Sequence, residues 1–340
     1  MHNDKHTRIR INYEKCNALA HLLSKFRNFK PDNFEDPKLY PPPSAPPKDV
    51  ANYFFFMVAI DHRTHPPGSV FLGEIDGEVY RGSLLLYRLA KLKWDEDPQF
   101  FSPERMSSID EKEVTEWLSV SKPKPATVKG PKLRASLLRD AGIKLLRFYD
   151  GDTMKIFERA EGSVWKIVEN LHIFTAYEDP VAKKAFLLIK FLERRGLWKI
   201  KDPQNLRVPV DNHLTRIAIR FGILEIKDEK LKRVLRERIP VSRDIDIELR
   251  MQAREAYAII SETSGIKATI LDDILWYIGR NCCSYRETPR CDSCERKACE
   301  LTAKLNIKCK GHCPLAESCS AAQEKELRQL YEQQFETWYY

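Results

Sequence analysis

The feature that most constrains the fold is the spacing of apolar residues, which is helical in nearly all of the chain after Pro131. Apolar side chains recur there at intervals of about three or four residues, the period of an α-helix that buries one face. No internal repeat is found in this part of the sequence. The spacing therefore predicts a mainly α-helical protein.

The part of the chain before Pro131 predicts further helices and one small β-hairpin. Residues 1–30 have the pattern of a short amphipathic helical segment, residues 50–60 (VANYFFFMVAI) that of a buried helix, and residues 83–92 that of another helix. The alternating stretch around Asp76-Gly77 predicts a hairpin, because this dipeptide suits a tight two-residue turn.

Two proline-rich stretches interrupt these elements. Residues 38–48 (KLYPPPSAPPK) predict a linker or an extended strap, because proline fixes φ and lacks an amide donor. Residues 121–131 (SKPKPATVKGP) are the best candidate for a boundary. We therefore expect an N-terminal helical region with the hairpin at 1–125, a helical domain at 126–280 and a cysteine-rich segment with a C-terminal helix at 281–340.

Composition limits the class of protein. Of the 340 residues, 43% are hydrophobic, which supports a sizeable core and rules out a disordered or fibrous chain. The formal net charge of +8 favours a polyanionic partner. The longest apolar run, Tyr53–Ile60, is far shorter than the roughly 20 residues of a membrane-spanning helix, and the N-terminus has no apolar signal segment. We expect a cytoplasmic protein with no membrane partner.

Charged residues lie at two predicted helix starts. Asp179 is suited to cap a helix with Pro180 at its first position, and the apolar body that follows (AFLLIKFL) predicts a buried helix with Lys183 and Lys184 in its first turns. Asp211 follows Val-Pro-Val and lies at the N-terminus of a helix predicted over 213–222, which glycine ends.

The sequence around the helix start at Asp211 resembles that of a known family. The stretch VPVDNHLTRIAIRFGIL (208–224) resembles the Val-Asp-Thr-His-Val motif, with the following Arg and Leu-Gly, of helix-hairpin-helix DNA glycosylases, the superfamily of endonuclease III and the adenine glycosylases. The resemblance implies a two-part helical glycosylase fold. It also assigns to Asp211 the carboxylate that stabilises positive charge on the sugar while the N-glycosidic bond breaks. The alternative for Asp211 is an ordinary N-cap.

Bifunctional members of that superfamily also use a lysine that attacks the sugar as a Schiff-base nucleophile. The resemblance places it at Lys183 in AKKAF, or at the adjacent Lys184, where partial burial would enlarge the neutral, nucleophilic fraction. The alternative is two solvated lysines near DNA phosphates. The family's hairpin, Leu-Pro-Gly-Val-Gly, is replaced here by residues 177–181 (YEDPV), which lack the glycines that let backbone amides approach a phosphate.

Eight of the nine cysteines lie between residues 282 and 319. Without a signal segment, such a cluster favours a metal or iron–sulfur site over disulfides. TPRCDSC (288–294) and GHCPLAESCSAA (311–322) resemble parts of the 4Fe–4S loops of endonuclease III and of the adenine glycosylases. The resemblance implies one 4Fe–4S cluster as the cofactor, with zinc or a pair of disulfides as alternatives. Two ligand sets fit: Cys283, Cys291, Cys294 and Cys299, or a mixed set ending in Cys313 and Cys319.

Positive charge is concentrated around the same cysteines. Between Arg280 and Lys310 there are eight Lys or Arg against four Asp or Glu, a surplus of four that is half of the net charge. Such a segment suits contact with phosphates. The candidate nucleic-acid contacts are His213, Arg216, Arg280 and Arg290.

A second family resembles more of the chain through shorter matches. The queuosine salvage proteins, which hydrolyse the N-glycosidic bond of a modified nucleoside or nucleotide, have text similar to residues 53–61, 79–92, 97–118, 174–188 and 245–256. This resemblance implies the helical glycosylase scaffold without the cysteine loop. Asp179 or Asp61 would then join Asp211 in the pocket, and Tyr53, Phe55 or Trp94 would stack on the base, with core packing as the alternative for the aromatic residues.

Both resemblances imply an enzyme that cleaves an N-glycosidic bond, but the substrates they imply differ. The main prediction is a DNA N-glycosylase of base excision repair, with an AP-lyase step if Lys183 attacks the sugar, a fold of the helix-hairpin-helix type and damaged duplex DNA as the partner. The alternative is a queuosine-type N-glycosidase that acts on a modified nucleoside or nucleotide.

Overall fold

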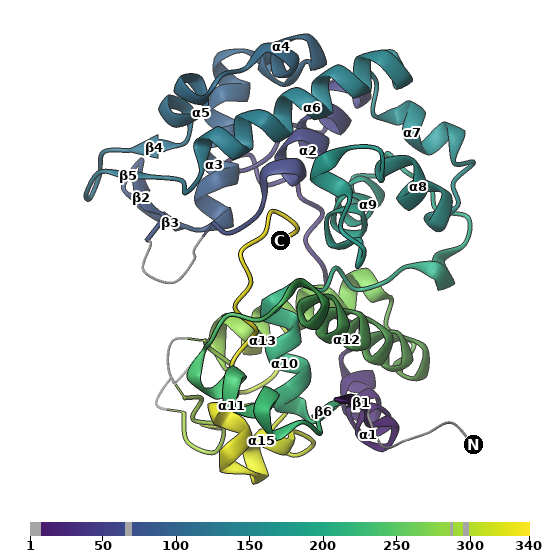
Figure 1. Cartoon of the computed structure of the whole chain (residues 1–340), viewed down its shortest axis with the longest axis vertical. Coiled ribbons are helices and arrows are strands. Elements are labelled where there is room, and N and C mark those ends of the chain that lie inside the picture. Colours follow the sequence, from purple (N-terminus) through teal and green to yellow (C-terminus); the bar gives the residue numbers. More distant parts are fainter. Residues whose placement is uncertain (1–7, 65–69, 286–287, 295–298) are drawn as a thin grey trace. The chain divides into compact units, whose positions relative to one another are not determined.

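The computed structural model describes residues 8–64, 70–285, 288–294 and 299–340 (Figure 1). Within these ranges the chain is mainly helical and its strands are short, which confirms a mainly α fold. The finer predictions, the helix-hairpin-helix fold with a cluster loop and the three regions of the chain, stay predictions. By contacts the chain divides into unit 1 (Met1–Pro31, Leu206–Glu336) and unit 2 (Asp32–Asn205, Thr337–Tyr340).

Unit 2 is built from helices, 3₁₀ turns and two small hairpins. In chain order its elements are α2 (Pro47–Ile60), β2 (Leu72–Ile75), β3 (Glu78–Arg81), α3 (Ser83–Glu96), η2 (Pro98–Phe101), α4 (Pro103–Ser108), α5 (Glu111–Trp117), β4 (Ser119–Val120), β5 (Ala126–Thr127), α6 (Pro131–Tyr149), α7 (Met154–Arg159), α8 (Val164–Leu171), η3 (Thr175–Tyr177), α9 (Lys183–Arg194) and η4 (Pro203–Asn205).

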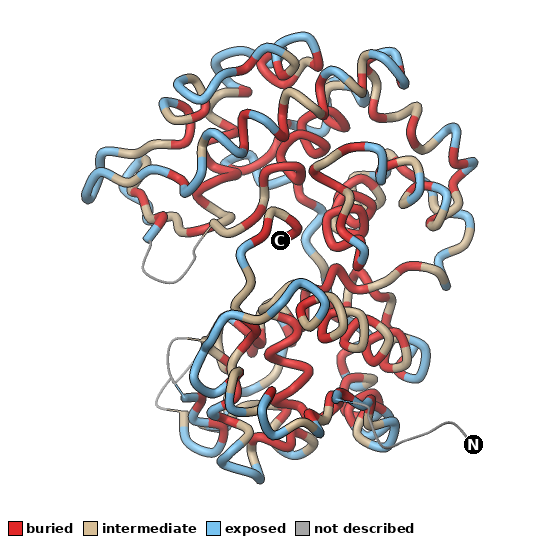
Figure 2. The backbone as a smooth tube through the Cα atoms, viewed as in Figure 1, coloured by how far each residue is buried: buried red, intermediate tan, exposed pale blue. Residues whose placement is uncertain are grey.

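Helix α2 forms the core of unit 2. Every residue from Val50 to Ile60 is buried, as the continuous red stretch of this helix shows in Figure 2. Its faces are covered by α6, α9 and η2 among others, so a helix that is apolar all round has a partner on every side. The predicted buried helix is confirmed, and so is the helix predicted over 83–92, which is part of α3.

The predicted hairpin is also present. Strands β2 and β3 pair antiparallel with Leu72 opposite Arg81. Asp76 and Gly77 join them with φ of 53° and 76°, the left-handed conformation that a tight two-residue turn of this kind needs.

Unit 1 is a helical body with one small sheet. Its elements are β1 (Ile9–Ile11), α1 (Tyr13–Leu23), η1 (Ser24–Phe26), α10 (Asn212–Phe221), β6 (Leu224–Ile226), α11 (Glu229–Glu237), α12 (Arg243–Ser264), α13 (Ala268–Asn281), α14 (Glu300–Lys304), α15 (Ser320–Gln323) and η5 (Lys325–Gln329). Helix α10 packs against α12 and α13, and β1 pairs with β6 so that Ile9 lies opposite Ile226.

Two predicted helices differ in their bounds. The segment over 1–30 is helical only in α1 and η1, because Ile9 and Ile11 alternate with exposed arginines and form strand β1 instead. Helix α9 begins at Lys183 rather than at Pro180, because Ala182 adopts a left-handed φ of 58° and interrupts the turn that Asp179 starts. Helix α10 begins and ends as predicted, with Gly222 at φ 80° after its last turn. Among the described residues, no helix combines the length and apolar character of a membrane span.

Candidate active site

Asp211 is held at the start of α10 in unit 1. Its Oδ1 accepts a hydrogen bond from the backbone N–H of Leu214 at 2.9 Å, and its carbonyl accepts from the N–H and the Oγ1 of Thr215 at 3.1 and 2.8 Å. The residue itself is partly exposed. The N-cap interaction is therefore observed, and it fixes a carboxylate at the edge of the protein surface. The catalytic role of Asp211 stays a prediction.

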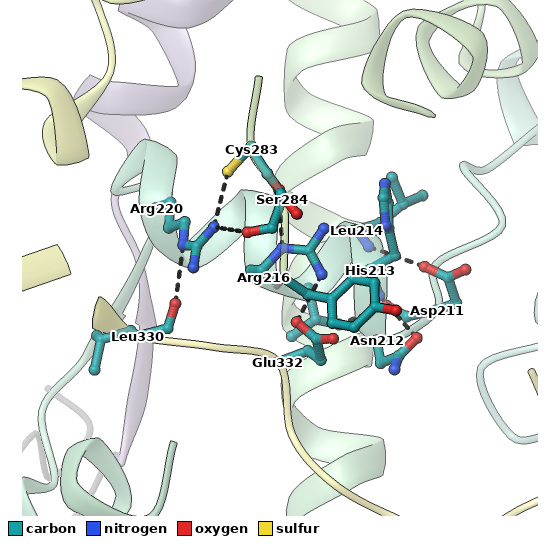
Figure 3. Close-up of polar contacts among 12 residues, drawn as sticks. Asp211, Asn212, His213, Leu214, Arg216, Arg220, Cys283, Ser284, Leu330 and Glu332 are labelled. Carbon is teal, nitrogen blue, oxygen red and sulfur yellow. Dashed lines mark hydrogen bonds and ion pairs between the residues drawn. The ribbon is translucent and has the colours of Figure 1, made fainter. Parts of the chain in front are cut away.

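One turn further along α10, Arg216 is buried with all three guanidinium nitrogens engaged (Figure 3). Nε donates to the carbonyl of Cys283 at 3.1 Å, Nη1 to Oε2 of Glu332 at 2.6 Å, and Nη2 contacts Nδ1 of His213 at 3.0 Å. Arg216 is 1% exposed and Glu332 6%. The arginine predicted to contact nucleic acid thus lies in the interior, in an ion pair.

The electrostatics of this network are set by burial and by the ion pair. Burial opposes the charge of Arg216, but Glu332 and Cys283 outweigh it and raise the pKa of Arg216. Burial, with the positive charges of Arg216, Arg280 and Arg220, holds the pKa of His213 well below its ordinary value. Since a guanidinium can only donate, we assign the lone pair to Nδ1 of His213 and the proton to Nε2.

The ring of His213 lies directly against helix α13. Its Nε2 is buried and has no hydrogen-bond partner among the described residues. A Cβ added at Gly279 would lie 1.8 Å from that atom. The absence of a side chain at Gly279 is therefore what allows the histidine to occupy this position.

A second buried arginine on α10 connects the same helix to the C-terminal segment and to the end of α13. Arg220 donates from Nε to the carbonyl of Leu330 at 2.9 Å, and from Nη1 to the carbonyl of Ser284 at 2.8 Å and Sγ of Cys283 at 3.3 Å (Figure 3). Two buried arginines thus anchor α10 to segments that are remote in sequence.

In unit 2, the start of α9 is organised by Asp179. This buried carboxylate accepts from the N–H of Val181 at 3.1 Å and from the N–H of Lys183 at 3.0 Å. It therefore accepts amide hydrogens at the start of α9 from four residues before Lys183, whereas the N-cap position itself is Ala182, not Asp179 as predicted. Lys183 and Lys184 are both in that turn and both are buried.

The amine of Lys184 points into the interior. Nζ donates to the carbonyl of Ala59 at 2.5 Å and lies 3.4 Å from Nδ1 of His62. Burial, together with the nearby charges of Lys183 and Arg134, lowers the pKa of Lys184 well below its ordinary value. Burial and the neighbouring cations, Lys184 foremost, likewise lower the pKa of His62. Burial and mutual repulsion thus disfavour the positively charged form of each side chain.

The aromatic residues proposed to stack on a base lie in the core of unit 2. Tyr53 donates its hydroxyl to the carbonyl of Leu39 at 2.8 Å and packs edge to face on Trp94, with ring centroids 5.9 Å apart. Phe55 stacks on Tyr177 at 5.3 Å. Core packing, the alternative for these side chains, is what is observed.

No cysteine is paired in a disulfide bond in the described part of the chain. Among the described residues, no group of three or more His, Cys, Asp or Glu side chains could hold a metal ion. This corrects the expectation of a metal-binding cluster, while the ligand roles assigned to Cys283, Cys291, Cys294, Cys299, Cys313 and Cys319 stay predictions. Several thiols have other contacts: Sγ of Cys319 donates to the carbonyl of Arg220 at 3.4 Å, and Cys299 caps α14. The 4Fe–4S cluster and the zinc alternative rest on the sequence alone.

The remaining predicted contacts lie at the surface of unit 1. Arg280 is exposed, and its guanidinium stacks on the ring of Trp276 at 4.3 Å from the centroid. Arg290 is exposed as well. Five of the charged positions in the predicted basic segment, 286, 287, 295, 296 and 297, lie outside the described residues.

Four ionisable residues of these clusters were not predicted from the sequence: Glu332, Arg220, His62 and Arg134. Arg134 is buried on α6 and donates to the carbonyls of His62 and Lys129. His62 directly follows Asp61, a candidate pocket residue, and this neighbour was the one feature of the sequence that pointed to His62. Glu332 belongs to no recognisable sequence motif, and its partner Arg216 is 116 positions away in the chain.

Comparison with known proteins identifies the family. The family model of the queuosine salvage protein matches residues 42–291, well over half of the chain, and the protein belongs to this family. The matched residues include the starts of both α9 and α10. A search of curated proteins finds no match.

The family corrects the main sequence prediction. The resemblance to queuosine salvage proteins is confirmed, whereas DNA repair and DNA binding, which depended on the resemblance to helix-hairpin-helix DNA glycosylases, are not what the family match indicates. The physical reason for the error is that a helix N-terminus with a capping aspartate and a following arginine is a local pattern. Arg216, the arginine of that pattern, is buried against Glu332.

Proposed function

We propose that the protein hydrolyses the N-glycosidic bond of a queuosine-type nucleoside or nucleotide and releases the modified base. Membership of the queuosine salvage family supports the substrate class. The observation that carries the reaction is the Asp211 carboxylate, which is fixed at the start of α10 and partly exposed.

The chemistry suits a carboxylate at this position. In the hydrolysis the C1′–N bond breaks, water adds at C1′, and the base leaves with a proton. Positive charge develops on the sugar in the transition state, and a carboxylate oriented beforehand stabilises it by several kcal/mol. The hydrogen bond from Leu214 orients Asp211 before the reaction starts, so little reorganisation is needed.

The two lysines have different parts in this proposal. Lys184 has no exposed surface and donates to the end of α2, so we assign it the task of holding Ala59 and His62 in place. Lys183 is 7% exposed at the first position of α9, and we assign it no step of the reaction. A Schiff-base step on DNA is not part of the proposal.

Release of free base from three substrates tests the function: queuosine, its 5′-monophosphate, and duplex DNA that contains a damaged base. Chromatography should detect base from the nucleoside or the nucleotide. Asp211→Asn should lower kcat about 100- to 1000-fold, because the amide carries no charge to stabilise the sugar. Asparagine is as good an N-cap as aspartate, so the variant should unfold at the same temperature as the wild type.

Asp228→Asn is the matched control. Asp228 caps α11 in the same unit by accepting from the N–H groups of Lys230 and Leu231 at 2.8 and 3.2 Å. Its substitution should leave kcat unchanged. Base release from DNA alone, or an Asp211→Asn variant with wild-type kcat on the nucleotide, would contradict the proposed function.

A further inference from the structure

A second polar side chain lies beside Asp211 at the start of α10 (Figure 3). Asn212 is the first residue of the helix and is partly exposed. Its Oδ1 accepts a hydrogen bond from the backbone N–H of His213 at 2.9 Å. This hydrogen bond identifies the oxygen of the amide and fixes its plane, so the nitrogen Nδ2 is presented on the other side.

The carboxylate of Asp211 and the amide of Asn212 lie over the same end of the helix. The N–H groups of the first turn of an α-helix have no partner within the helix and point away from its N-terminus. Asp211 accepts one of them, from Leu214 at 2.9 Å, and Asn212 accepts the one before it, from His213. The two accepting oxygens therefore lie within about 9 Å of each other. A ribose that makes hydrogen bonds of about 3 Å on either side spans such a gap.

The nitrogen of this amide is available to a substrate. Nδ2 of Asn212 has no hydrogen-bond partner among the residues that the structure describes. The other polar side chains that follow Asp211 in this turn are directed inward. Nδ1 of His213 faces Arg216 at 3.0 Å, and Oγ1 of Thr215 donates to the carbonyl of Asp211 at 2.8 Å. Asn212 thus presents a partly exposed donor beside the carboxylate that we assign to the reaction.

We propose that Nδ2 of Asn212 donates a hydrogen bond to the 2′-hydroxyl oxygen of the substrate's ribose, and that the enzyme thereby favours ribonucleotides over 2′-deoxyribonucleotides. The inference rests on the proposed function, which places the Asp211 carboxylate beside C1′. Two acceptors of the sugar adjoin C1′: the ring oxygen and the 2′-hydroxyl. A donor at the ring oxygen would oppose the positive charge that develops there, whereas hydrogen bonds to this hydroxyl of a sugar strengthen in the transition state.

The test compares kcat/KM for release of base from queuosine 5′-monophosphate and from its 2′-deoxy analogue. The ratio of the two values includes the different stability of the two N-glycosidic bonds, which cancels when a variant is compared with the wild type. Asn212→Ala should lower the ribo-to-deoxy ratio about 5- to 10-fold, because only the ribonucleotide loses a hydrogen bond.

Asn212→Asp separates the donor from the rest of the side chain. Aspartate keeps an oxygen for the N–H of His213 but has no N–H of its own, so the ratio should fall as in Asn212→Ala. Its added charge acts on both substrates and cancels in the ratio. Asn17→Ala, at an exposed asparagine of α1 in the same unit, is the matched control and should keep the wild-type ratio. A wild-type ratio in either Asn212 variant overturns the assignment, and Asn212→Ala decides alone if Asn212→Asp is inactive.

Asp211→Asn, assayed in parallel, distinguishes the two proposals. If it loses activity on both substrates while Asn212→Ala keeps the wild-type ratio, the contact of Asn212 is overturned and the function of Asp211 stands. If Asp211→Asn is fully active, the proposed function fails and the inference fails with it.

Discussion

The starts of α9 in unit 2 and α10 in unit 1 have the same ingredients and opposite electrostatics. Each has an aspartate that accepts backbone N–H groups, a basic side chain directed into the interior, and a histidine whose Nε2 is buried without a partner among the described residues. At α10 the basic residue, Arg216, meets a carboxylate at 2.6 Å. At α9 the basic residue, Lys184, meets a carbonyl and an imidazole.

The difference lies in what surrounds each buried basic group: a carboxylate balances the charge of the guanidinium, whereas a carbonyl and an imidazole face the amine. Glu332 balances Arg216, and the pKa of the guanidinium rises despite burial. Around Lys184, burial and like charges act in the same direction, and the pKa of the amine falls. The α10 cluster is thus a buried ion pair, and the α9 cluster is a place where burial and like charges lower the pKa of an amine.

The largest expected effect on stability comes from a substitution that breaks the ion pair at α10. Arg216→Met leaves Glu332 buried without its partner and should lower the free energy of unfolding by about 3–5 kcal/mol. Arg216→Met/Glu332→Leu removes both charges and should recover most of that loss. Urea unfolding followed by circular dichroism measures both variants. A double variant as unstable as the single one would mean that the hydrogen bond to Cys283, and not the ion pair, dominates.

A smaller effect is expected where His213 meets α13. Gly279→Ala places a methyl group on the buried Nε2 and should destabilise the protein by about 1–3 kcal/mol. In a His213→Ala background the same substitution should cost almost nothing, since the space is then open. The coupling free energy from this double-mutant cycle measures the contact, and a value near zero would show that the ring moves aside freely.

Local signals in the sequence predicted much of the framework. The apolar run of α2, the Asp76-Gly77 turn and the two ends of α10 each depend on residues within a few positions of one another, and all three are observed. The start of α9 was misplaced because Ala182 adopts a left-handed conformation that alanine rarely takes. Nothing in the residues around it signals that choice.

The interior contacts of the candidate site could not be predicted in the same way. A helix-start arginine looks the same in sequence whether it faces phosphate or a buried carboxylate. Only tertiary structure brings Glu332 to Arg216, across 116 positions of the chain. The same holds for Lys184 and the carbonyl of Ala59, which are 125 positions apart.

The third prediction concerns the buried amine of Lys184 at α9. The pKa of Lys184 is lowered in the folded state, so between the folded pKa and the unfolded value of about 10.5 the unfolded chain binds a proton that the folded chain does not. Stability should therefore rise with pH toward that value, by at most about 1.4 kcal/mol per pH unit for one proton. Lys184→Met removes this group.

The difference in unfolding free energy between wild type and Lys184→Met, measured from pH 7 to 9, isolates the amine from every other titrating group. The wild type should gain on the variant as pH rises. A difference independent of pH would mean that the amine keeps its proton in the folded state, and the contrast between the two helix starts would fail.

The smallest effect tests the shared feature, the capping aspartates. Asp179→Ala and Asp211→Ala should each cost about 1 kcal/mol. Asp211→Asn should cost close to nothing, because the amide oxygen also accepts the N–H of Leu214. At Asp211 stability and activity should separate, since Asn keeps the cap and loses the reaction. Asp179 accepts Val181 on Oδ1 and Lys183 on Oδ2, so Asp179→Asn keeps only one of these hydrogen bonds and should lose stability while most of the activity stays in place. A loss of activity in Asp179→Asn as large as in Asp211→Asn would contradict this distinction between the two aspartates.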